Sequence, residues 1–270
     1  WDNGEFKGDA ISTTSELVKI SSDGNLGLEE GQKFERGGIY RFTVDVTKGN
    51  TKAVLTVEKV GKVDLPAPDI FFGNDKMEVT DTDIYKSEQV FTQGQMITVT
   101  GIDNLNEWWI DPDFFEKQSD GALKFLPING DYRVTANAVL KYFSVMALKD
   151  GKPAKLQDDG TGAIWAIGKG IGKPSVTSSE VGWEPSKALC LAQVASKKYQ
   201  LTLKAGETLK TSGDPEVISF KFFHQNDWGG EFGNYASSIL VEQLKLADSG
   251  NLEMQDNKAF EEGAVYRDRK

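Results

Sequence analysis

The sequence has one cysteine and one histidine among its 270 residues, and this scarcity excludes several kinds of site. Cys190 cannot form a disulfide within the chain, and its apolar neighbours predict a buried side chain. His224 and Cys190 together cannot supply the three or four nitrogen or sulfur ligands that a zinc site needs. No G-x-S-x-G motif accompanies His224, so we expect it to be structural rather than a catalytic base.

Positive charge is also scarce, and long apolar runs are absent. The chain has 31 Lys and Arg against 41 Asp and Glu, a net charge of −10. Nucleic acids and anionic lipid surfaces attract basic proteins, so this balance argues against both as partners. A neutral polymer such as a glycan needs no basic face. No run of 18 apolar residues is present, so no transmembrane helix is expected.

The most informative feature that is present is an internal repeat. Residues 4–41 return as residues 230–267 without a gap, and 15 of the 38 positions are identical. Such self-similarity indicates a duplicated module. The first copy runs on into further β-rich sequence, whereas the second has a long lead-in and little after it. We therefore expect a first module without its front half, a last module without its final strands, and a chain that is a piece of a longer protein.

A weaker echo of the repeat lies in the middle of the chain. Residues 120–133 carry Asp-Gly followed by Gly-x-Tyr-Arg, as residues 23–41 do. The sequence therefore predicts a tandem array of related units.

Alternating apolar residues predict that these units are built from strands. Tyr40, Phe42, Val44 and Val46 alternate with polar residues, which is typical of a strand with one buried face. Frequent Asp-Gly and Gly-Asn turns and the lack of a long amphipathic helix favour tandem immunoglobulin-like antiparallel β-sandwich modules, the terminal ones incomplete. A proline-containing linker and a second boundary near residue 150 divide the chain into three expected units. Residues 1–62 are the back half of a module, residues 63–149 are a β-sandwich module, and residues 150–270 are a further module.

Several motifs resemble ligand-binding or catalytic motifs but lack their full pattern. The glycine-rich stretch 168–173 does not match a phosphate-binding loop and is expected to be a flexible loop. Asp111-x-Asp113 offers oxygen ligands for calcium, but the full spacing of a calcium loop is missing, so we favour acidic turns in water. Asp227 and Glu231 could form a pair of catalytic carboxylates. Because Glu231 recurs as Glu5, a binding or structural role is favoured, and no cofactor or metal is expected.

The tryptophans suggest what these modules bind. Trp108 and Trp109 are adjacent in an expected strand, so one should face inward and the other should lie near solvent. Trp183 follows a glycine turn, and Trp228 lies in a loop rich in Asn, Asp and Gly. Exposed indole rings beside polar side chains suit sugar rings, because the flat face packs on C–H groups while the neighbours bind hydroxyls. Core packing is the alternative for each tryptophan. We expect at least one of these tryptophans to bind a ligand.

A series of short motifs in the last unit resembles a known family. The motifs, in chain order, are Gly160–Gly168, Gly182-Trp183, Tyr199–Leu203, Phe220-Lys-Phe222, Asp227–Phe232, Gly250-Asn-Leu252 and Gly263-x-x-Tyr266. In this order they resemble the tandem glycan-binding modules of the SusE/SusF type, surface lipoproteins of Bacteroides-like glycan-utilisation systems. Residues 1–60 match the back half of that pattern. The middle unit matches only at its end.

The resemblance implies a non-catalytic, lipid-anchored outer-membrane protein that binds an oligo- or polysaccharide, with a transporter complex as a further partner. Trp183 and Trp228 are the positions that the motif transfers, with Lys221 as a polar neighbour. The full expected set of glycan-binding residues is Trp183, Trp228, Trp109, Lys221, Asn226, Asp227, Glu231 and Tyr235. A structural spacer or protein-interaction protein is the alternative, and a glycoside hydrolase accessory domain is a third interpretation.

Overall fold

The structure is a computed structural model that describes residues 6, 8–213, 217–232, 244–246, 251–254 and 265–267. Strands and turns make up almost all of these residues, which confirms the predicted all-β fold. The chain divides into two compact units, residues 1–67 and 68–270. The predicted boundary near residue 150 lies inside the second unit, and the division into three domains stays a prediction. No helix in the described ranges is long and apolar enough to cross a membrane.

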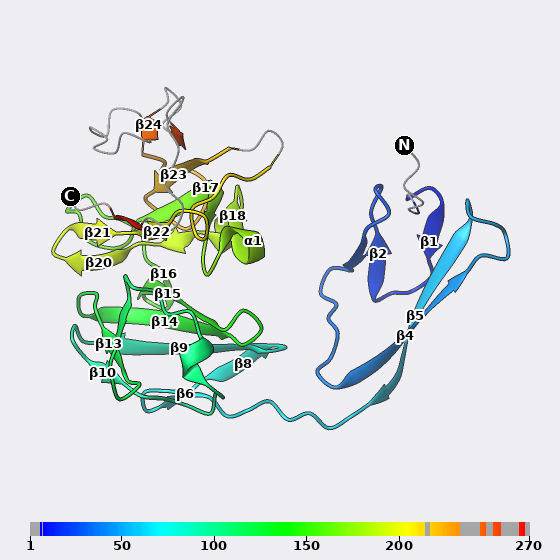
Figure 1. Cartoon of the computed structure of the whole chain (residues 1–270), viewed down its shortest axis with the longest axis horizontal. Helices are drawn as coiled ribbons and strands as arrows, with labels where there is room; N and C mark the ends of the chain where they lie inside the picture. Colours follow the sequence, from blue (N-terminus) through cyan, green and yellow to red (C-terminus); the bar gives the residue numbers. More distant parts are fainter. Residues whose placement is uncertain are drawn as a thin grey trace. The chain divides into compact units, whose positions relative to one another are not determined.

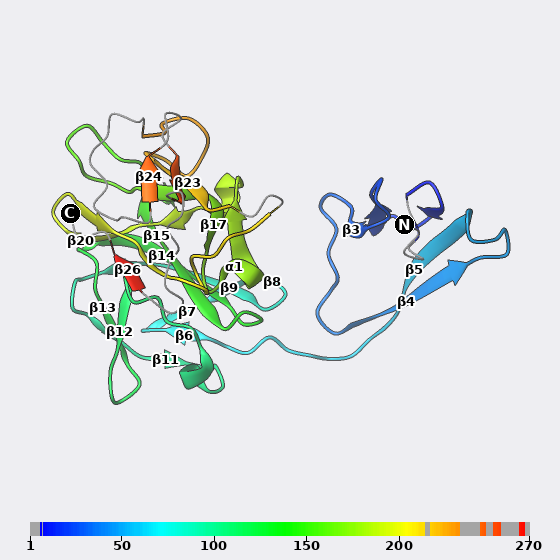
Figure 2. The same ribbon diagram turned by 45° about the horizontal axis from the view of Figure 1, so that its top comes forward.

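The N-terminal unit contains a three-stranded sheet and a separate hairpin (Figure 1). Its strands are β1 (Ile11–Thr13), β2 (Val18–Ile20), β3 (Leu26–Leu28), β4 (Gly38–Asp45) and β5 (Ala53–Lys62). The sheet order is β1-β5-β4, and β2 pairs with β3. One pairing departs from the antiparallel expectation, because β1 runs parallel to β5. Figures 1 and 2 show β4 and β5 as a long hairpin.

The predicted buried face of β4 is largely uncovered. Phe42 and Val44 lie opposite Val57 and Leu55 of β5, so all four side chains share one face of the sheet. Val57 and Leu55 pack against Val18 of β2 and are buried. Tyr40 of β4 also packs against this cluster, whereas Phe42 and Val44 lie outside it and are 49% and 47% exposed. The alternation of apolar residues therefore identified which side chains of β4 share a face. Whether that face is buried depends on other strands packing over it.

The second unit begins with a sandwich of short strands around a five-stranded sheet of order β16-β15-β14-β9-β8. Two three-stranded sheets, of order β10-β13-β12 and β11-β6-β7, complete it. The elements are β6 (Phe71–Phe72), β7 (Asp75–Lys76), β8 (Glu78–Asp81), β9 (Ile84–Phe91), β10 (Met96–Ile97), β11 (Val99–Thr100), the 3₁₀ turn η1 (Leu105–Glu107), β12 (Phe115–Lys117), β13 (Leu123–Phe125), β14 (Gly130–Asn137), β15 (Tyr142–Lys149) and β16 (Lys152–Pro153).

Aromatic rings fill the interior of this sandwich. Phe72 of β6 lies 5.3 Å from Phe143 of β15, measured between ring centroids, and Trp108 stacks on Phe143 at 4.6 Å. Trp108 is buried, whereas its neighbour Trp109 is half-buried, as expected for successive side chains of an extended segment. Burying each such ring stabilises the fold by about 1.5–3 kcal/mol.

The remainder of the second unit is a larger sheet with two small two-stranded sheets, of order β20-β21 and β22-β26. Its main sheet has the order β18-β17-β23-β25-β24, with β19 also paired to β17. The elements are β17 (Trp165–Gly172), α1 (Val176–Ser179), β18 (Glu180–Gly182), the 3₁₀ turn η2 (Pro185–Lys187), β19 (Leu189–Cys190), β20 (Ala192–Ala195), β21 (Lys198–Gln200), β22 (Thr202–Lys204), β23 (Ser219–Phe223), β24 (Leu244–Leu246), β25 (Leu252–Met254) and β26 (Val265–Arg267).

The glycine-rich stretch 168–173 is not the flexible loop that was expected. Residues 165–172 form the buried strand β17. Gly168 has a φ of 144°, and a Cβ atom built there would lie 2.3 Å from the Phe220 Cα atom of β23. The glycines are therefore required by the close approach of neighbouring backbone.

The two copies of the repeat form the same hairpin. In the first copy Val18, Lys19 and Ile20 of β2 pair with Leu28, Gly27 and Leu26 of β3. Adding 226 to each number gives the pairing between β24 and β25. The backbone register of the two hairpins is therefore identical, which supports the duplication inferred from sequence.

The Gly-x-Tyr motif shared by the first and middle units also has a structural role. The Tyr132 hydroxyl donates a hydrogen bond to the Ile128 carbonyl oxygen at 2.9 Å. The Tyr40 hydroxyl accepts one from the Glu35 N–H, also at 2.9 Å. In each case the ring lies against the glycine two residues earlier and ties the start of a strand to the chain that precedes it.

A buried charge cluster joins the two parts of the second unit. The Lys173 ammonium, just after β17, lies 2.7 Å from Asp111 Oδ2 and 3.2 Å from Asp113 Oδ2. Gln200 and Thr202 donate further hydrogen bonds to Asp113. The expectation of acidic turns in water is therefore wrong for this pair. The two carboxylates lie in the interior because an ammonium distant in sequence compensates their charge.

The three ionised groups of this cluster differ in their pKa shifts. Burial alone would raise the pKa of Asp113, but Lys173 and the hydrogen bonds from Gln200 and Thr202 outweigh it and lower that pKa. Burial raises the pKa of Asp111, which receives fewer hydrogen bonds. Burial alone would lower the pKa of Lys173, but the two aspartates raise it.

These shifts predict how the stability of residues 68–270 depends on pH. Asp113, with a lowered pKa, contributes stability above its unfolded value of about 3.9, and this is lost as pH falls through its folded pKa. Asp111, with a raised pKa, destabilises the folded state while it is ionised. On acidification it binds a proton before Asp113 does, and this destabilisation is then lost. Lys173 contributes stability below about pH 10.4 that is lost as pH rises through its folded pKa. We expect denaturant midpoints to fall only below about pH 4 and again at strongly alkaline pH.

The two aspartates provide the control for this pH dependence. Asp113→Asn should remove more of the acid-side loss of stability than Asp111→Asn, because Asp113 holds the lowered pKa. Equal pH profiles for the two variants and the unaltered chain would show that the cluster does not govern acid stability.

Candidate functional site

The candidate site lies where two strands of the main sheet end at the same edge. Strand β17 is antiparallel to both β18 and β23, so these two strands run in the same direction; β23 ends opposite Trp165 at the start of β17, and β18 ends opposite Gly168. Trp183 follows the last residue of β18, Gly182, which has a φ of 57°. Trp228 lies in the loop that follows β23. This strand order brings two tryptophans together that are 45 residues apart in the sequence.

The two indole rings form a partly exposed aromatic surface. Their ring centroids are 6.4 Å apart, and the rings are inclined by only 25°. Trp228 is 50% exposed, while Trp183 is half-buried against the core of the sheet. Phe223 meets Trp228 edge-on from below, with 6.1 Å between centroids. The pair therefore combines one supported ring with one ring available to solvent.

Hydrogen bonds fix the loop that carries Trp228. The Trp228 N–H donates to Asp227 Oδ1 at 2.7 Å, and Gln225 Nε2 donates to the Trp228 carbonyl oxygen at 2.6 Å. At the base of the loop the His224 N–H donates to the Gly230 carbonyl oxygen at 2.7 Å. Glycines at 229 and 230, both at positive φ, allow the reversal. The indole is thus presented by a closed loop.

Polar residues of the predicted set lie in this loop or in the strand before it. Asp227 and Glu231 are exposed, one before and one after Trp228 in the chain, and Lys221 is half-buried on β23. A carboxylate accepts several hydrogen bonds, so Asp227 keeps acceptor capacity beyond its bond to the backbone. Asn226 is half-buried, and its Oδ1 atom is buried without a hydrogen-bond partner. The exposed Asp227 carboxylate can therefore bind a hydroxyl next to the exposed indole ring, whereas the Asn226 Oδ1 atom is buried and does not face a ligand at the surface.

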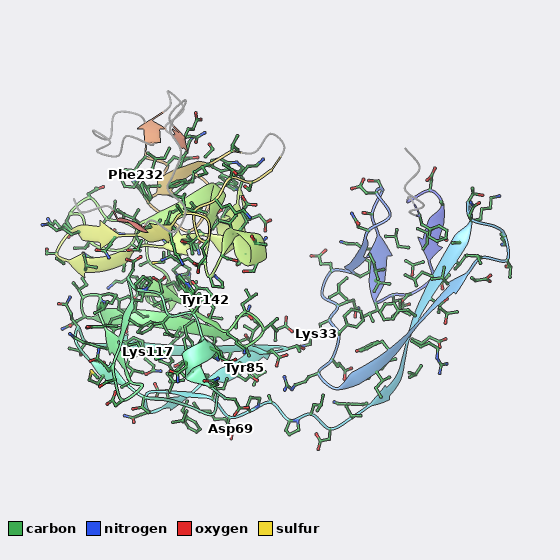
Figure 3. All side chains as sticks on the ribbon, viewed as in Figure 1. Lys33, Asp69, Tyr85, Lys117, Tyr142 and Phe232 are labelled. Carbon is green, nitrogen blue, oxygen red and sulfur yellow. The ribbon has the colours of Figure 1, made fainter. Side chains whose placement is uncertain are left out.

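Two other predicted residues are not placed in this group. Trp109 lies at the junction of the second unit, where its Nε1–H donates to Glu207 Oε1 at 3.2 Å and its ring meets Tyr142 edge-on. Figure 3 labels Tyr142 at this junction. Tyr235 lies outside the described residues. Trp109 therefore contributes to the joint between the two parts rather than to the Trp183–Trp228 surface.

His224 and Cys190 occupy structural environments. The His224 ring, just after β23, packs edge-on against Phe232, with 4.3 Å between centroids. Cys190 is buried, and burial raises the pKa of its thiol to about 12. In the described ranges no group of three or more His, Cys, Asp or Glu side chains is placed to hold a metal ion.

Sequence reasoning missed two residues that shape this region. Gln225 supports the Trp228 loop, and its position directly after a strand in a polar stretch was the available signal. Lys173 carries the buried charge of the junction. Its neighbours, a glycine run and a proline, gave no indication that a lysine would be buried there.

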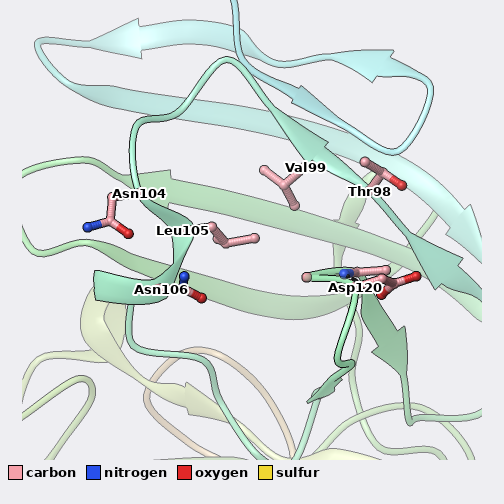
Figure 4. Close-up of a pocket in the computed structure, with 8 residues that line it drawn as sticks. Thr98, Val99, Asn104, Leu105, Asn106 and Asp120 are labelled. Atoms are coloured by element: carbon pink, nitrogen blue, oxygen red, sulfur yellow. Dashed lines mark hydrogen bonds between the residues drawn. The ribbon is translucent and has the colours of Figure 1, made fainter.

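A separate hollow of about 310 Å³ lies in the first part of the second unit (Figure 4). Its lining includes Thr98, Asn104, Leu105, Asn106 and Asp120. No aromatic side chain lines it, so it lacks the flat apolar surface that stacks on a sugar ring.

Two family models match parts of this chain. A family model described as "Domain of unknown function (DUF5121)" matches residues 1–47 and 159–268, the two stretches that contain the repeat copies. A second model, "Domain of unknown function (DUF5125)", matches residues 63–156. Searches of curated proteins and of solved structures found no match.

Proposed function

This chain belongs to the DUF5121 family, and we propose that its C-terminal module binds a carbohydrate chain without cleaving it, through Trp183 and Trp228. The observation that supports this proposal is the half-exposed Trp228 ring, stacked beside Trp183 on a loop closed by hydrogen bonds. A ring held in place loses little conformational entropy when a ligand binds, which favours binding by stacking.

The chemistry around the rings fits an uncharged polar ligand. The apolar face of a pyranose ring would pack on the Trp228 indole, while Asp227, Glu231 and Lys221 would bind its hydroxyls. The net charge of −10 disfavours strongly acidic polymers as ligands. We therefore propose a neutral oligo- or polysaccharide. The resemblance to SusE/SusF modules supports a setting at the bacterial outer membrane, in a glycan-uptake system.

Substitution of Trp228 tests this proposal. We expect the unaltered chain to be retarded by at least one neutral polysaccharide in affinity electrophoresis, and Trp228→Ala to lower its affinity at least tenfold, or about 1.4 kcal/mol in calorimetry. Trp183→Ala should have a similar effect, because it removes the support of the exposed ring. Val139→Ala, at a position 71% exposed in the other part of the unit, is the matched control and should change nothing.

Two outcomes would contradict the proposal. One is a polysaccharide panel that never retards the folded chain. The other is binding that Trp228→Ala leaves intact. Release of new reducing ends that Glu231→Gln abolishes would instead identify a hydrolase, the enzymatic alternative that the paired carboxylates left open.

A further inference from the structure

The uncovered face of the N-terminal unit invites comparison with the second copy of the repeat. We name residues 159–229 the front half of a module, and residues 230–267 its back half. Residues 4–41 correspond to a back half. In the C-terminal module, two front-half strands pair with the back half, β23 with β25 and β22 with β26. Among the described residues of the N-terminal unit, β3 pairs only with β2, and β4 only with β5.

The corresponding residues differ in burial in the way this difference predicts. Leu252 of β25 lies opposite Phe220 of β23 and packs against the core of the main sheet. Its counterpart in the first copy, Leu26 of β3, is 47% exposed. Phe42 and Val44 of β4, and Val46 just after the strand ends, are all close to half exposed. Exposed apolar surface beside an unpaired strand edge marks an interaction site.

We propose that β3 and β4 form a docking surface for the front half of a second module of the same family, a segment with the strand pattern of residues 165–223. The strand pairings of the C-terminal module predict the register of this contact. A strand equivalent to β23 pairs with β3 so that its Phe220 counterpart lies opposite Leu26. A strand equivalent to β22 pairs with β4 so that its Leu203 counterpart lies opposite Tyr40.

This register places an apolar layer over the exposed face of β4. In the C-terminal module Leu203 of β22 packs in one core with Trp165, Ile167 and Phe220 of the main sheet. The equivalent layer would extend the β2–β3 hairpin sideways and cover Phe42 and Val44. Main-chain hydrogen bonds would provide affinity, and the alternating apolar side chains would provide specificity. The proposal does not depend on glycan binding.

A seamless fusion tests the proposal in the full chain. Because Gly4 corresponds to Gly230, a second copy of residues 159–229 can be joined directly to Gly4, with the chain continuing to residue 270. We expect amide hydrogen exchange at Leu26–Leu28 and Gly38–Asp45 to slow roughly a hundredfold relative to the unextended chain, because these strands gain partners. The same fusion with Phe220→Asp and Leu203→Asp in the added segment is the control, and should show no such protection.

Substitution of Phe42 keeps the proposal testable if exchange is difficult to interpret. In the unextended chain Phe42→Ser should leave the denaturant midpoint almost unchanged, since the ring is half exposed. In the fusion the same substitution should lower it clearly. Unaltered exchange at β3 and β4 in a folded fusion would overturn the proposal. So would an unextended chain that is already a dimer with these strands protected, because the occupant would then be a second copy.

Discussion

Replacing Lys173 by methionine should destabilise residues 68–270 by about 3–5 kcal/mol, because it leaves two carboxylates buried without a compensating charge. Asp111 and Asp113 are each at most 3% exposed and cannot turn toward water without opening the junction. For a unit of this size, the expected loss corresponds to a fall in melting temperature of roughly 10 °C. Denaturant titration followed by circular dichroism measures it.

A matched control separates this effect from the loss of any lysine. Lys204 also forms an ion pair, at 2.6 Å from Glu207, but its side chain is 49% exposed. Lys204→Met should therefore cost less than about 1 kcal/mol. The effect of Lys173→Met should also shrink at low pH, because the stranded carboxylates can then bind protons. Equal midpoints for the two variants at pH 7 would mean that the buried cluster does not hold the junction.

Gly168→Ala should be the second most disruptive substitution, with an expected loss of at least about 3 kcal/mol from strain and overpacking. The new Cβ atom would lie 2.3 Å from the Phe220 Cα atom and 2.4 Å from the Ser219 carbonyl oxygen, so strands β17 and β23 would have to separate. Because β23 leads into the Trp228 loop, we expect this variant to disturb the aromatic surface as well. Near-ultraviolet circular dichroism and denaturant titration report the two effects.

Gly182 is the natural control for Gly168, because the two residues are paired between β18 and β17. Gly182 also has a positive φ, but nothing lies within 4 Å of a Cβ atom built there. Gly182→Ala should therefore cost only about 1 kcal/mol, from backbone conformation alone. If Gly168→Ala were as mild as this, the close contact between β17 and β23 would not be a constraint on the fold.

The strands were predictable because their signal is local. The alternation that begins at Tyr40 marked one face of β4. The repeat predicted a duplicated module, and the structure adds that the β2–β3 and β24–β25 hairpins have the same register. The glycines of β17 carried the opposite local signal, since a run of glycine resembles a loop. Gly168 is required because the backbone of β23 at Phe220 lies against it, and a contact with a strand so distant in the sequence leaves no local pattern.

The candidate site was predictable as a list of residues but not as an arrangement. Motifs identified Trp183 and Trp228, yet their contact depends on β17 lying between β18 and β23. Trp109 was also predicted to bind the ligand, but it lies at the junction, where Glu207 accepts a hydrogen bond from its indole N–H. Asp111 and Asp113 resembled a solvated turn because their partner, Lys173, is about 60 residues away.

The buried ion cluster also has a consequence for how such proteins can be recombined. Asp111 and Asp113 belong to residues 63–156, which match the DUF5125 model. Lys173 belongs to residues 159–268, which match the DUF5121 model. Exchanging either stretch for a relative with an apolar residue at the matching position would leave an unneutralised charge in the interior. The two stretches should therefore be inherited, and engineered, as a single cassette.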